Sequence, residues 1–342
     1  MKAIGFTQSL PVDDPRALQD LELPEPVATG RDLLVEVRAI SVNPVDTKVR
    51  RNAAPKDGKP LPAARVLGFD AAGVVRAVGP DCTLFNVGDE VFYAGAINRQ
   101  GSNAELQLVD ERIVGHKPQS IGFAQAAALP LTAITAWELL FDRLQVPRGS
   151  EGSAENLLVV GGAGGVGSIL IQLAVELTPL NVIATASRKS SADWCRELGA
   201  HVVVDHSKPL NAELRGADIE QVRYVASLTN TDAHFAHYVE MLAPQGRLAL
   251  IDDPHSPLDA RLLKPKCLSL HWEAMFARST YGTPDMIAQH ELLNAVATMV
   301  DAGQLRSTLA ETLGRIDAAN LRRAHALIES GRTIGKLVLE GF

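Results

Sequence analysis

The chain has 342 residues, of which 46% are hydrophobic and 21% are charged, and its formal net charge is −7. This composition is typical of an ordinary globular protein of about two domains. The acidic balance and the lack of a long lysine and arginine run argue against a nucleic-acid-binding surface.

The N-terminal segment has no apolar stretch of the kind found in signal peptides. Cys82, Cys195 and Cys267 are far apart and show no paired spacing. This pattern is typical of a reducing compartment and predicts neither a disulfide framework nor a cysteine-bound structural zinc. We therefore expect a cytoplasmic protein.

Residues 1–125 predict an irregular, mostly antiparallel β-domain. Asp32–Val42 alternates partly between apolar and polar residues, and turn residues separate further short strands: Ala72–Val78, Glu90–Tyr93 and Ala104–Val109. Asn43-Pro44 predicts a helix start, with Asn43 as N-cap, that leads into Val45–Arg51.

The segment Leu157–Val175, LLVVGGAGGVGSILIQLAV, is the most informative part of the chain. A strand over Leu157–Val160 runs into clustered glycines, and a helical pattern follows over Ser168–Leu177. Gly162-x-Gly164-x-x-Gly167 fits the dinucleotide-binding fingerprint, in which a helix N-terminus holds the pyrophosphate. We expect the backbone of this turn to bind the cofactor: Gly162, Ala163, Gly164, Gly165 and Val166.

The same uncharged segment is long enough to be weighed as a membrane span. The clustered glycines would break such a helix near its start, at about 1 kcal/mol each relative to alanine. Glu155 and Glu176 flank the segment closely, so it barely reaches spanning length. We therefore favour the nucleotide site and expect no membrane partner.

From residue 157 onward, short apolar strands alternate with helical segments, which predicts a doubly wound parallel sheet. The predicted later strands are Val182–Ala186, Val202–Val204, Tyr224–Leu228, Leu248–Ile251 and Lys266–Trp272, and the helices between them are Ser191–Leu198 and Asp232–Leu242. The last part of the chain predicts helices over Pro284–Ala302 and Ala318–Ser330, and strands over Leu305–Leu309 and Lys336–Leu339.

Several separated motifs together resemble one family: Asn43–Asp46, Gly68–Gly73, Val87–Val91, Leu129–Ala133, the glycine turn and Gly335-Lys336. The chain resembles a medium-chain dehydrogenase/reductase of the quinone oxidoreductase branch, among the members called zinc-type alcohol dehydrogenase-like proteins. The resemblance implies an α/β protein with a Rossmann doubly wound parallel sheet and a GroES-like, mostly antiparallel β catalytic domain. It implies a catalytic domain of residues 1–128 and 277–342, an NADP-binding domain of residues 129–276, a cleft between them as active site, and a homodimer.

Zinc-containing members of this superfamily have ligands at the positions of Asn43, Phe69 and Leu131 in this chain. None of these side chains provides a thiolate or an imidazole. The segment Phe85–Val109 lacks the cysteines of a structural zinc lobe. His234 and His237 have a spacing that could chelate a metal, but a solvated helix face is the preferred interpretation. We therefore predict no zinc.

NAD-type folds place an acidic residue about 20 positions after the glycine turn, on the ribose 2′-hydroxyl. This chain has Ser187, Arg188 and Lys189 there, which are suited to a 2′-phosphate. We therefore predict NADP(H). His206 stands where a relative would place a tyrosine near the adenine.

Further site residues follow from the resemblance and from their places at helix starts and strand ends. Asn43 and Asp46 are the predicted catalytic residues, and Asn43 is also a plain N-cap candidate. Predicted cofactor contacts are Asn43, Thr132, Ser187, Arg188, His206, Leu228 and Lys336, and predicted substrate contacts are Phe69, Asp252, Trp272 and Phe276. Asp252 also fits a turn, and Trp272 and Phe276 also fit a hydrophobic core.

Without a Lewis acid, the alkoxide formed from a simple ketone has little to stabilise it. Reduction of an enone or a quinone spreads the charge, so a few hydrogen-bond donors suffice. We therefore predict a zinc-independent, NADPH-dependent reductase of small quinones or enones. A zinc-dependent alcohol dehydrogenase and a non-catalytic NADPH-binding structural or regulatory protein are the two alternatives.

Overall fold

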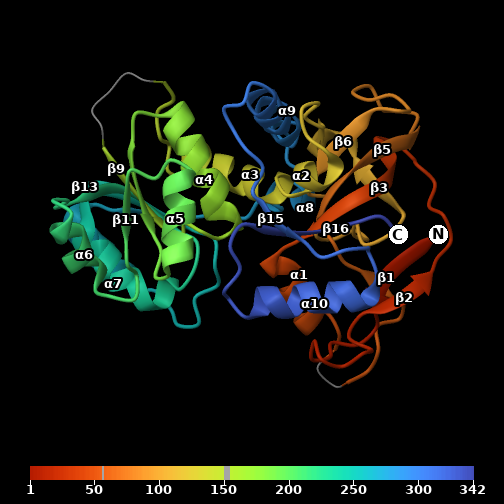
Figure 1. The fold of residues 1–342 in the computed structure, drawn as a ribbon, viewed down its shortest axis with the longest axis horizontal. Helices are drawn as coiled ribbons and strands as arrows, with labels where there is room; N and C mark the ends of the chain where they lie inside the picture. Colours follow the sequence, from red (N-terminus) through yellow and green to blue (C-terminus); the bar gives the residue numbers. More distant parts are fainter. Residues whose placement is uncertain (56–57, 150–154) are drawn as a thin grey trace. The chain divides into compact units, whose positions relative to one another are not determined.

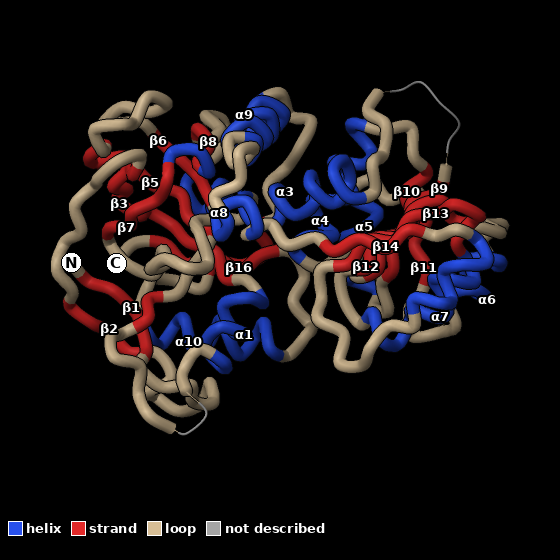
Figure 2. The backbone as a smooth tube through the Cα atoms, turned by 180° about the vertical axis from the view of Figure 1, so that it is seen from behind, coloured by secondary structure: helices blue, strands red, loops and turns tan. Residues whose placement is uncertain are grey.

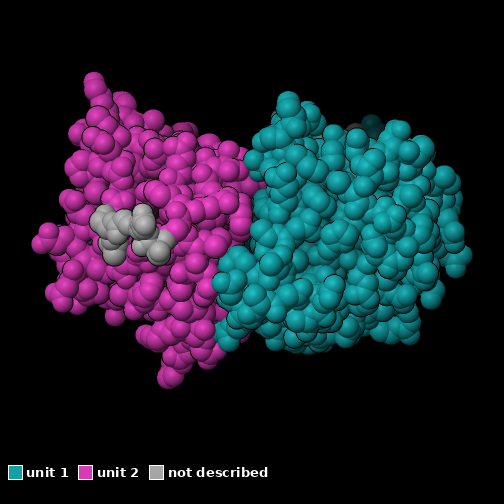
Figure 3. Space-filling view, turned by 90° about the horizontal axis from the view of Figure 1, so that it is seen from above, with its two compact units in different colours: residues 1–134, 276–342 teal, residues 135–275 magenta. Residues whose placement is uncertain are grey.

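The computed structural model describes residues 1–55, 58–149 and 155–342. The chain divides into two compact units, unit 1 of Met1–Ile134 and Phe276–Phe342 and unit 2 of Thr135–Met275 (Figure 3). The predicted divisions lie close by, at 128/129 and 276/277. Each unit has its own sheet and its own hydrophobic core.

Unit 1 contains a seven-stranded sheet and a three-stranded sheet (Figure 1). Its strands are β1 (Lys2–Phe6), β2 (Gln19–Glu22), β3 (Asp32–Val42), β4 (Arg65–Val66), β5 (Asp70–Val78), β6 (Glu90–Tyr93), β7 (Leu106–Asp110), β8 (Val114–His116), β15 (Leu309–Thr312) and β16 (Lys336–Glu340). The larger sheet has the order β15-β16-β3-β5-β6-β8, with β7 paired to β3, and the smaller sheet has the order β2-β1-β4. All pairs are antiparallel except β15 with β16.

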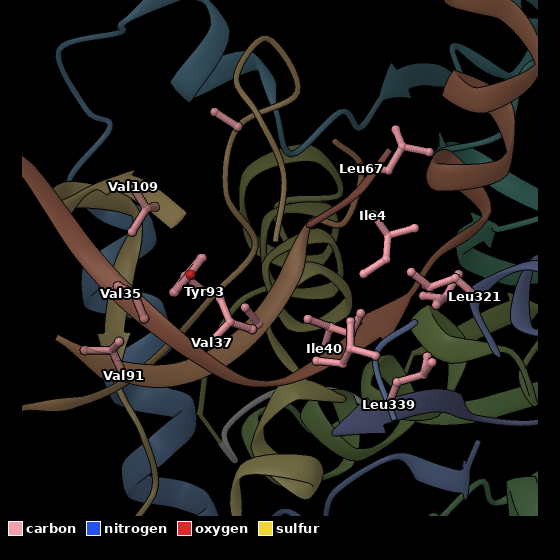
Figure 4. Packing of buried hydrophobic residues seen from close by; sticks show 14 of the residues in the cluster. Ile4, Val35, Val37, Ile40, Leu67, Val91, Tyr93, Val109, Leu321 and Leu339 are labelled. Atoms are coloured by element: carbon pink, nitrogen blue, oxygen red, sulfur yellow. The ribbon is translucent and has the colours of Figure 1, made fainter. Parts of the chain in front are cut away.

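Strand β3 organises unit 1 because it pairs with β5, β7 and β16. Its buried residues Val35, Val37 and Ile40 pack with residues of the other strands and of a C-terminal helix (Figure 4). Full burial of each such side chain stabilises the fold by roughly 1.5–3 kcal/mol. The core therefore fixes the end of β3, at Val42, from which the first helix departs.

The helices of unit 1 come from distant parts of the chain (Figure 1). They are α1 (Pro44–Asn52), α2 (Phe123–Ala127), α3 (Pro130–Trp137, which crosses into unit 2), α8 (Ala277–Tyr281), α9 (Ala288–Asp301) and α10 (Ala318–Glu329). Helix α10 packs on α1, and α9 packs on β8. The helical run Phe123–Arg143 is long and apolar enough to cross a membrane, but 78% of its apolar window is buried, which indicates a core helix.

Unit 2 is built on a six-stranded sheet in which every pair is parallel. Its strands are β9 (Asn156–Val160), β10 (Asn181–Thr185), β11 (Val202–Val204), β12 (Val222–Ser227), β13 (Leu242–Leu250) and β14 (Ser269–Trp272). The spatial order β11-β10-β9-β12-β13-β14 is the 3-2-1-4-5-6 order of a Rossmann sheet. The order reverses between β9 and β12, which is where ligands of such sheets bind.

The helices of unit 2 are α4 (Gly165–Leu177), α5 (Lys189–Glu197), α6 (Leu210–Gly216) and α7 (Thr231–Met241). Helices α4 and α5 lie on one side of the sheet, and α6 and α7 pack together on the other (Figures 1 and 2). Because helices bury both faces of the sheet, its strands are continuous runs of apolar residues.

The predicted fold class is confirmed, with corrections to particular elements. The strand expected over Leu305–Leu309 lies instead at Leu309–Thr312, because the N–H of Leu305 donates to Met299 in a turn after α9. Sequence reasoning did not predict α6, a short and largely polar helix, and it gave β13 less than its full length.

Candidate functional site

The glycine turn joins β9 to α4 at the carboxyl edge of the parallel sheet. Gly161 has a φ of +84°, which residues with a side chain rarely adopt. A Cβ on Gly162 would lie 2.8 Å from the Cβ of Ala184, and a Cβ on Gly167 would lie 2.5 Å from the carbonyl oxygen of Gly161. The positive φ therefore favours glycine at position 161, and close packing leaves no room for a side chain at positions 162 and 167.

Helix α4 begins with Gly164 as its N-cap, which has no side chain to satisfy the first N–H groups. Those N–H groups have no partner within the helix, and the helix dipole favours negative charge there. Among the described residues, only the carbonyl oxygen of Gly161, 3.5 Å away, comes within 4 Å of a Cβ placed on Gly164. The backbone from Gly162 to Val166 therefore forms a helix start that fits a phosphate group.

Thr185, at the end of β10, connects the glycine turn to His206. Its hydroxyl oxygen accepts a hydrogen bond from the N–H of Gly161 at 3.0 Å and lies 3.0 Å from Nδ1 of His206. Burial lowers the pKa of His206, so this imidazole is neutral at pH 7. Leu228, at the end of β12, lies 3.8 Å from the Cβ position of Gly161. The structure thus brings two predicted cofactor residues, His206 and Leu228, to the glycine turn.

Ser187 and Arg188 follow β10 after one buried alanine and have exposed side chains, with Arg188 as the N-cap of α5. Lys189 forms an ion pair with Asp193 at 2.5 Å. Arg188 forms no ion pair with any residue that the structure describes, although a cation at a helix N-terminus opposes the dipole. Its guanidinium therefore fits an anionic ligand such as a 2′-phosphate, and the residues of this edge fit NADP(H) as a whole.

Unit 1 holds a second group of site residues, which we call the buried polar cluster: Asn43, Asp46, Asp70 and Lys336. Each has an exposed fraction of 3% or less. The Nζ of Lys336 donates hydrogen bonds to Asp70 Oδ2 at 2.9 Å and to Asn43 Oδ1. The Nδ2 of Asn43 donates to the same Asp70 oxygen at 2.8 Å. Asn43, Asp70 and Lys336 therefore each contact the other two.

Asp46 ties the start of α1 to the segment before β5. Its carboxylate accepts the N–H of Asn43 at 2.8 Å and the N–H of Gly68 at 3.0 Å. Burial raises the pKa of Asp46 to about 7, and the two N–H donors act in the opposite direction. Asn43 is the N-cap of α1 by its backbone, but its side chain makes no capping hydrogen bond and turns toward Asp70.

Apolar side chains lie next to this cluster. The rings of Phe69 and Phe276 are 5.0 Å apart with an interplanar angle of 59°, and Phe69 is 1% exposed. The N–H of Leu131 donates to Asp70 Oδ1 at 2.7 Å. The buried Thr132 donates its hydroxyl to the carbonyl oxygen of Leu129 at 3.0 Å. The structure thus brings Asn43 and Leu131 together on Asp70, the residue that follows Phe69.

The three positions that the resemblance assigns to zinc ligands carry an amide, a phenyl ring and an isobutyl group. Protein zinc sites use thiolates, imidazoles and carboxylates. The ammonium of Lys336 also lies against Asn43 and Asp70, and a fixed positive charge disfavours a cation there. Within residues 1–55, 58–149 and 155–342, no group of three His, Cys, Asp or Glu side chains is placed to hold a metal. The residues of this site do not fit zinc.

Two predicted substrate residues lie in unit 2. Asp252 follows β13, and its carboxylate accepts the N–H of Thr231 at 2.9 Å and the hydroxyl of the same residue. It therefore holds the start of α7. Trp272 ends β14 and is 52% exposed. Their contact with a substrate stays a prediction.

Sequence reasoning missed a pair of buried acids in unit 2, Glu138 and Glu273. Arg143 donates to Glu273 Oε2 at 2.8 Å and lies 3.9 Å from Glu138. Burial, followed by the neighbouring Glu138, raises the pKa of Glu273 far above that of an ordinary carboxyl. A proton shared between the two acids accounts for this arrangement.

Sequence reasoning also missed Asp70, which holds the buried polar cluster of unit 1 together, and Thr185, which joins the glycine turn of unit 2 to His206. Asp70 stands alone as an acid in the apolar run around Phe69 and Ala71, and a lone acid at such a position is a recognisable mark of a buried pair. Thr185 ends an apolar strand, and nothing in the sequence around it indicates that its side chain binds the glycine turn.

Family models match two stretches of the chain. The alcohol dehydrogenase GroES-like domain matches residues 29–136, and the zinc-binding dehydrogenase model matches residues 198–339. A zinc-type alcohol dehydrogenase-like protein of Staphylococcus aureus is 41% identical over 340 residues, which cover 99% of both chains. A 2-methylene-furan-3-one reductase of Solanum lycopersicum is 35% identical over 61% of this chain and 53% of its own length.

Solved structures are similar over the whole chain. A Rhizobium etli protein described as a zinc-dependent alcohol dehydrogenase has 55% identity and a TM-score of 0.95, with 100% and 98% of the two chains covered. A Pseudomonas syringae quinone oxidoreductase has 26% identity and a TM-score of 0.82, with 99% of both chains covered. A mycobacterial protein complexed with NADPH has 26% identity and a TM-score of 0.81, with 99% and 100% covered.

The likeness to the staphylococcal protein extends over both units of the chain, and the likeness to the Pseudomonas syringae structure extends over 99% of it. The chain belongs to the medium-chain dehydrogenase/reductase superfamily, among the zinc-type alcohol dehydrogenase-like proteins, and is an oxidoreductase of that family.

Proposed function

We propose that the protein is a zinc-independent, NADPH-dependent reductase of small quinones or α,β-unsaturated carbonyl compounds. The observation that carries this proposal is the chemistry of the buried polar cluster. Its residues offer hydrogen-bond donors and a fixed positive charge in place of zinc ligands. Such a site suits a substrate whose reduced form spreads its negative charge.

NADPH is assigned to unit 2. The backbone of Gly162 to Val166 would hold the pyrophosphate at the start of α4, and Arg188 with Ser187 would hold the 2′-phosphate. The neutral imidazole of His206 would pack beside the adenosine part. NADPH, when bound, supplies a hydride.

Asn43 is the proposed catalytic residue. When an enone gains a hydride at its β-carbon, the π electrons move to the carbonyl oxygen, and a proton from water then reaches the α-carbon. The amide N–H of Asn43 is the donor assigned to that oxygen. Phe69 and Phe276, whose rings pack at 5.0 Å, would provide an apolar surface for the carbon skeleton of the substrate.

One relative that acts on an unsaturated ketone and one quinone oxidoreductase support this choice of substrate. One curated relative is named a 2-methylene-furan-3-one reductase, and one similar structure is a quinone oxidoreductase. A mycobacterial relative was solved in complex with NADPH. We further propose a cytoplasmic homodimer, as the resemblance implies, and light scattering of the purified protein tests the dimer.

The direct test is steady-state oxidation of NADPH with a panel of quinones and cyclic enones. We expect multiple turnovers with NADPH and much slower reaction with NADH. Tight NADPH binding without turnover across the panel would contradict the proposal and favour a non-catalytic NADPH-binding protein. Oxidation of simple alcohols that depends on added zinc would favour a zinc alcohol dehydrogenase.

A further inference from the structure

Lys336 was predicted to contact the cofactor, and its ammonium group is buried in unit 1. The side chain is 3% exposed, and its three N–H donors point to Asp70 Oδ2, Asn43 Oδ1 and the carbonyl oxygen of Val42. The contact to Val42 is long, at 3.4 Å. Because all three donors are directed at acceptors of the same unit, the arrangement indicates a role inside the buried polar cluster.

The chemistry of this cluster decides which way the amide of Asn43 faces. An ammonium group only donates hydrogen bonds, and an ionised carboxylate only accepts them. Oδ1 of Asn43 must therefore face Lys336, and Nδ2 must face Asp70, as the contacts show. The opposite orientation would put two donors together at Lys336 and two acceptors together at Asp70. The ion pair thus excludes one of the two amide orientations.

This orientation leaves one N–H of Asn43 weakly held. One hydrogen of Nδ2 is used by Asp70 at 2.8 Å, and the other has, among the described residues, only the carbonyl oxygen of Ser41, 3.4 Å from Nδ2. Lys336 on the amide oxygen also polarises the amide, which strengthens its N–H as a donor. An oxygen that gains negative charge is a better acceptor than a carbonyl at 3.4 Å.

We propose that Lys336 is a positioning residue for the reduction: paired with Asp70, it holds the Asn43 amide so that an N–H, and not the amide oxygen, is presented to the substrate oxygen. This inference rests on the proposed function, because it needs a reaction in which Asn43 takes part. It assigns Lys336 to the chemical step and gives it no contact with the cofactor phosphates.

The test compares Lys336→Met and Lys336→Arg in the full-length protein, with NADPH and a simple cyclic enone. We expect Lys336→Met to lower kcat by about 10²–10³, the usual cost of losing one oriented donor, and to leave the Kd of NADPH within about twofold. Lys336→Arg should recover a large part of kcat. A raised Kd for NADPH with an unchanged kcat would overturn the proposal and favour a phosphate contact.

A second measurement asks whether Lys336 acts through Asn43. If it does, adding Lys336→Met to an Asn43→Ala protein should change kcat by less than about threefold, because coupled residues are not additive. If Lys336→Met lowers kcat by the same factor in the Asn43→Ala protein as in the wild type, the two residues act independently and the proposal is contradicted. If Lys336→Met does not fold, the double variant Lys336→Met/Asp70→Asn removes the unpaired carboxylate, and it should show the same loss of kcat with a normal Kd for NADPH.

Lys117 provides the matched control. It is also buried in unit 1, where its Nζ donates to Pro118 and Ile121 at 2.8 Å and pairs with Glu90 at 3.1 Å. Lys117→Met should lower stability and leave kcat unchanged, and an equal loss of kcat there would overturn the proposal. If the wild-type protein turns over no enone or quinone, the proposed function itself fails. If it does and Lys336→Met keeps its kcat, only this inference fails.

Discussion

The glycine turn of unit 2 and the buried polar cluster of unit 1 are built in opposite ways. The turn offers backbone N–H groups, and it depends on the positive φ of Gly161 and on the lack of room for a side chain at Gly162 and Gly167. The cluster offers side chains whose charges and hydrogen bonds must match each other, since each of Asn43, Asp70 and Lys336 contacts the other two. A site made of backbone groups is therefore damaged by substitutions that add a side chain. A site made of paired side chains is damaged by substitutions that change a charge.

The largest effect should follow from breaking the ion pair of the cluster. Asp70→Ala leaves the buried ammonium of Lys336 without its counter-charge, which should lower the free energy of unfolding by about 3–5 kcal/mol. Urea denaturation measures this loss. The control Asp14→Ala removes the partner of the exposed Arg16 and should leave the unfolding midpoint nearly unchanged. Equal midpoints for the two variants would show that the cluster does not hold unit 1 together.

A side chain at Gly164 should damage cofactor binding without damaging the fold. Gly164 has φ −73° and a Cβ there has only a 3.5 Å neighbour, so alanine fits the free protein but lies where a pyrophosphate must approach. We expect Gly164→Ala to weaken NADPH binding by about 10–100-fold, measured by calorimetry. Gly122 is the matched control, because it is the N-cap of α2 with φ −73° and has open space around it. Gly122→Ala should leave NADPH binding unchanged.

The exposed cation after β10 should set the choice between cofactors. Arg188→Ala should weaken NADPH binding by about tenfold, the usual cost of one charge-assisted hydrogen bond, and leave NADH binding unchanged. Lys189→Ala serves as the control, because Lys189 is paired with Asp193. Equal losses for NADPH and NADH would contradict a 2′-phosphate contact at Arg188.

The smallest effect at neutral pH concerns the acid pair of unit 2. The pKa of Glu273 is raised from 4.5 to about 9, so the folded protein binds more protons than the unfolded chain between these values. Its contribution to stability is therefore full below about pH 4.5 and is lost as the pH rises toward 9. Glu273→Gln, which mimics the protonated acid, should flatten the fall in melting temperature between pH 6 and pH 9. The exposed Glu220→Gln should leave that slope unchanged, and identical slopes for all three proteins would contradict a shared proton.

The same contrast explains how much was predictable from the sequence. The glycine turn, the strands of the parallel sheet and β3 follow from local patterns, because glycine restrictions and apolar runs lie in neighbouring residues. The cluster joins Asn43, Asp70 and Lys336, which are hundreds of residues apart at the extremes, and no local pattern records their pairing. The sequence indicated Asn43 and Asp46 as site residues and Lys336 as a cofactor contact, but it missed Asp70, the common partner of Asn43 and Lys336.

The acid pair was missed for the same reason. Glu138 lies at the end of an apolar helical run and Glu273 directly after β14, and only the fold brings them to one arginine. Elements with weak patterns also escaped prediction. Helix α6 has few apolar residues, and β15 begins at the residue where the predicted strand was to end.

The most direct test of the central claim is to measure bound zinc and NADPH-dependent enone or quinone reduction on the same purified protein, before and after chelation. The account predicts full activity at far less than stoichiometric zinc, and no gain when zinc is returned, because Asn43, Phe69 and Leu131 provide no zinc ligands and Lys336 holds the positive charge. Activity that falls and recovers in proportion to one zinc per chain would contradict it.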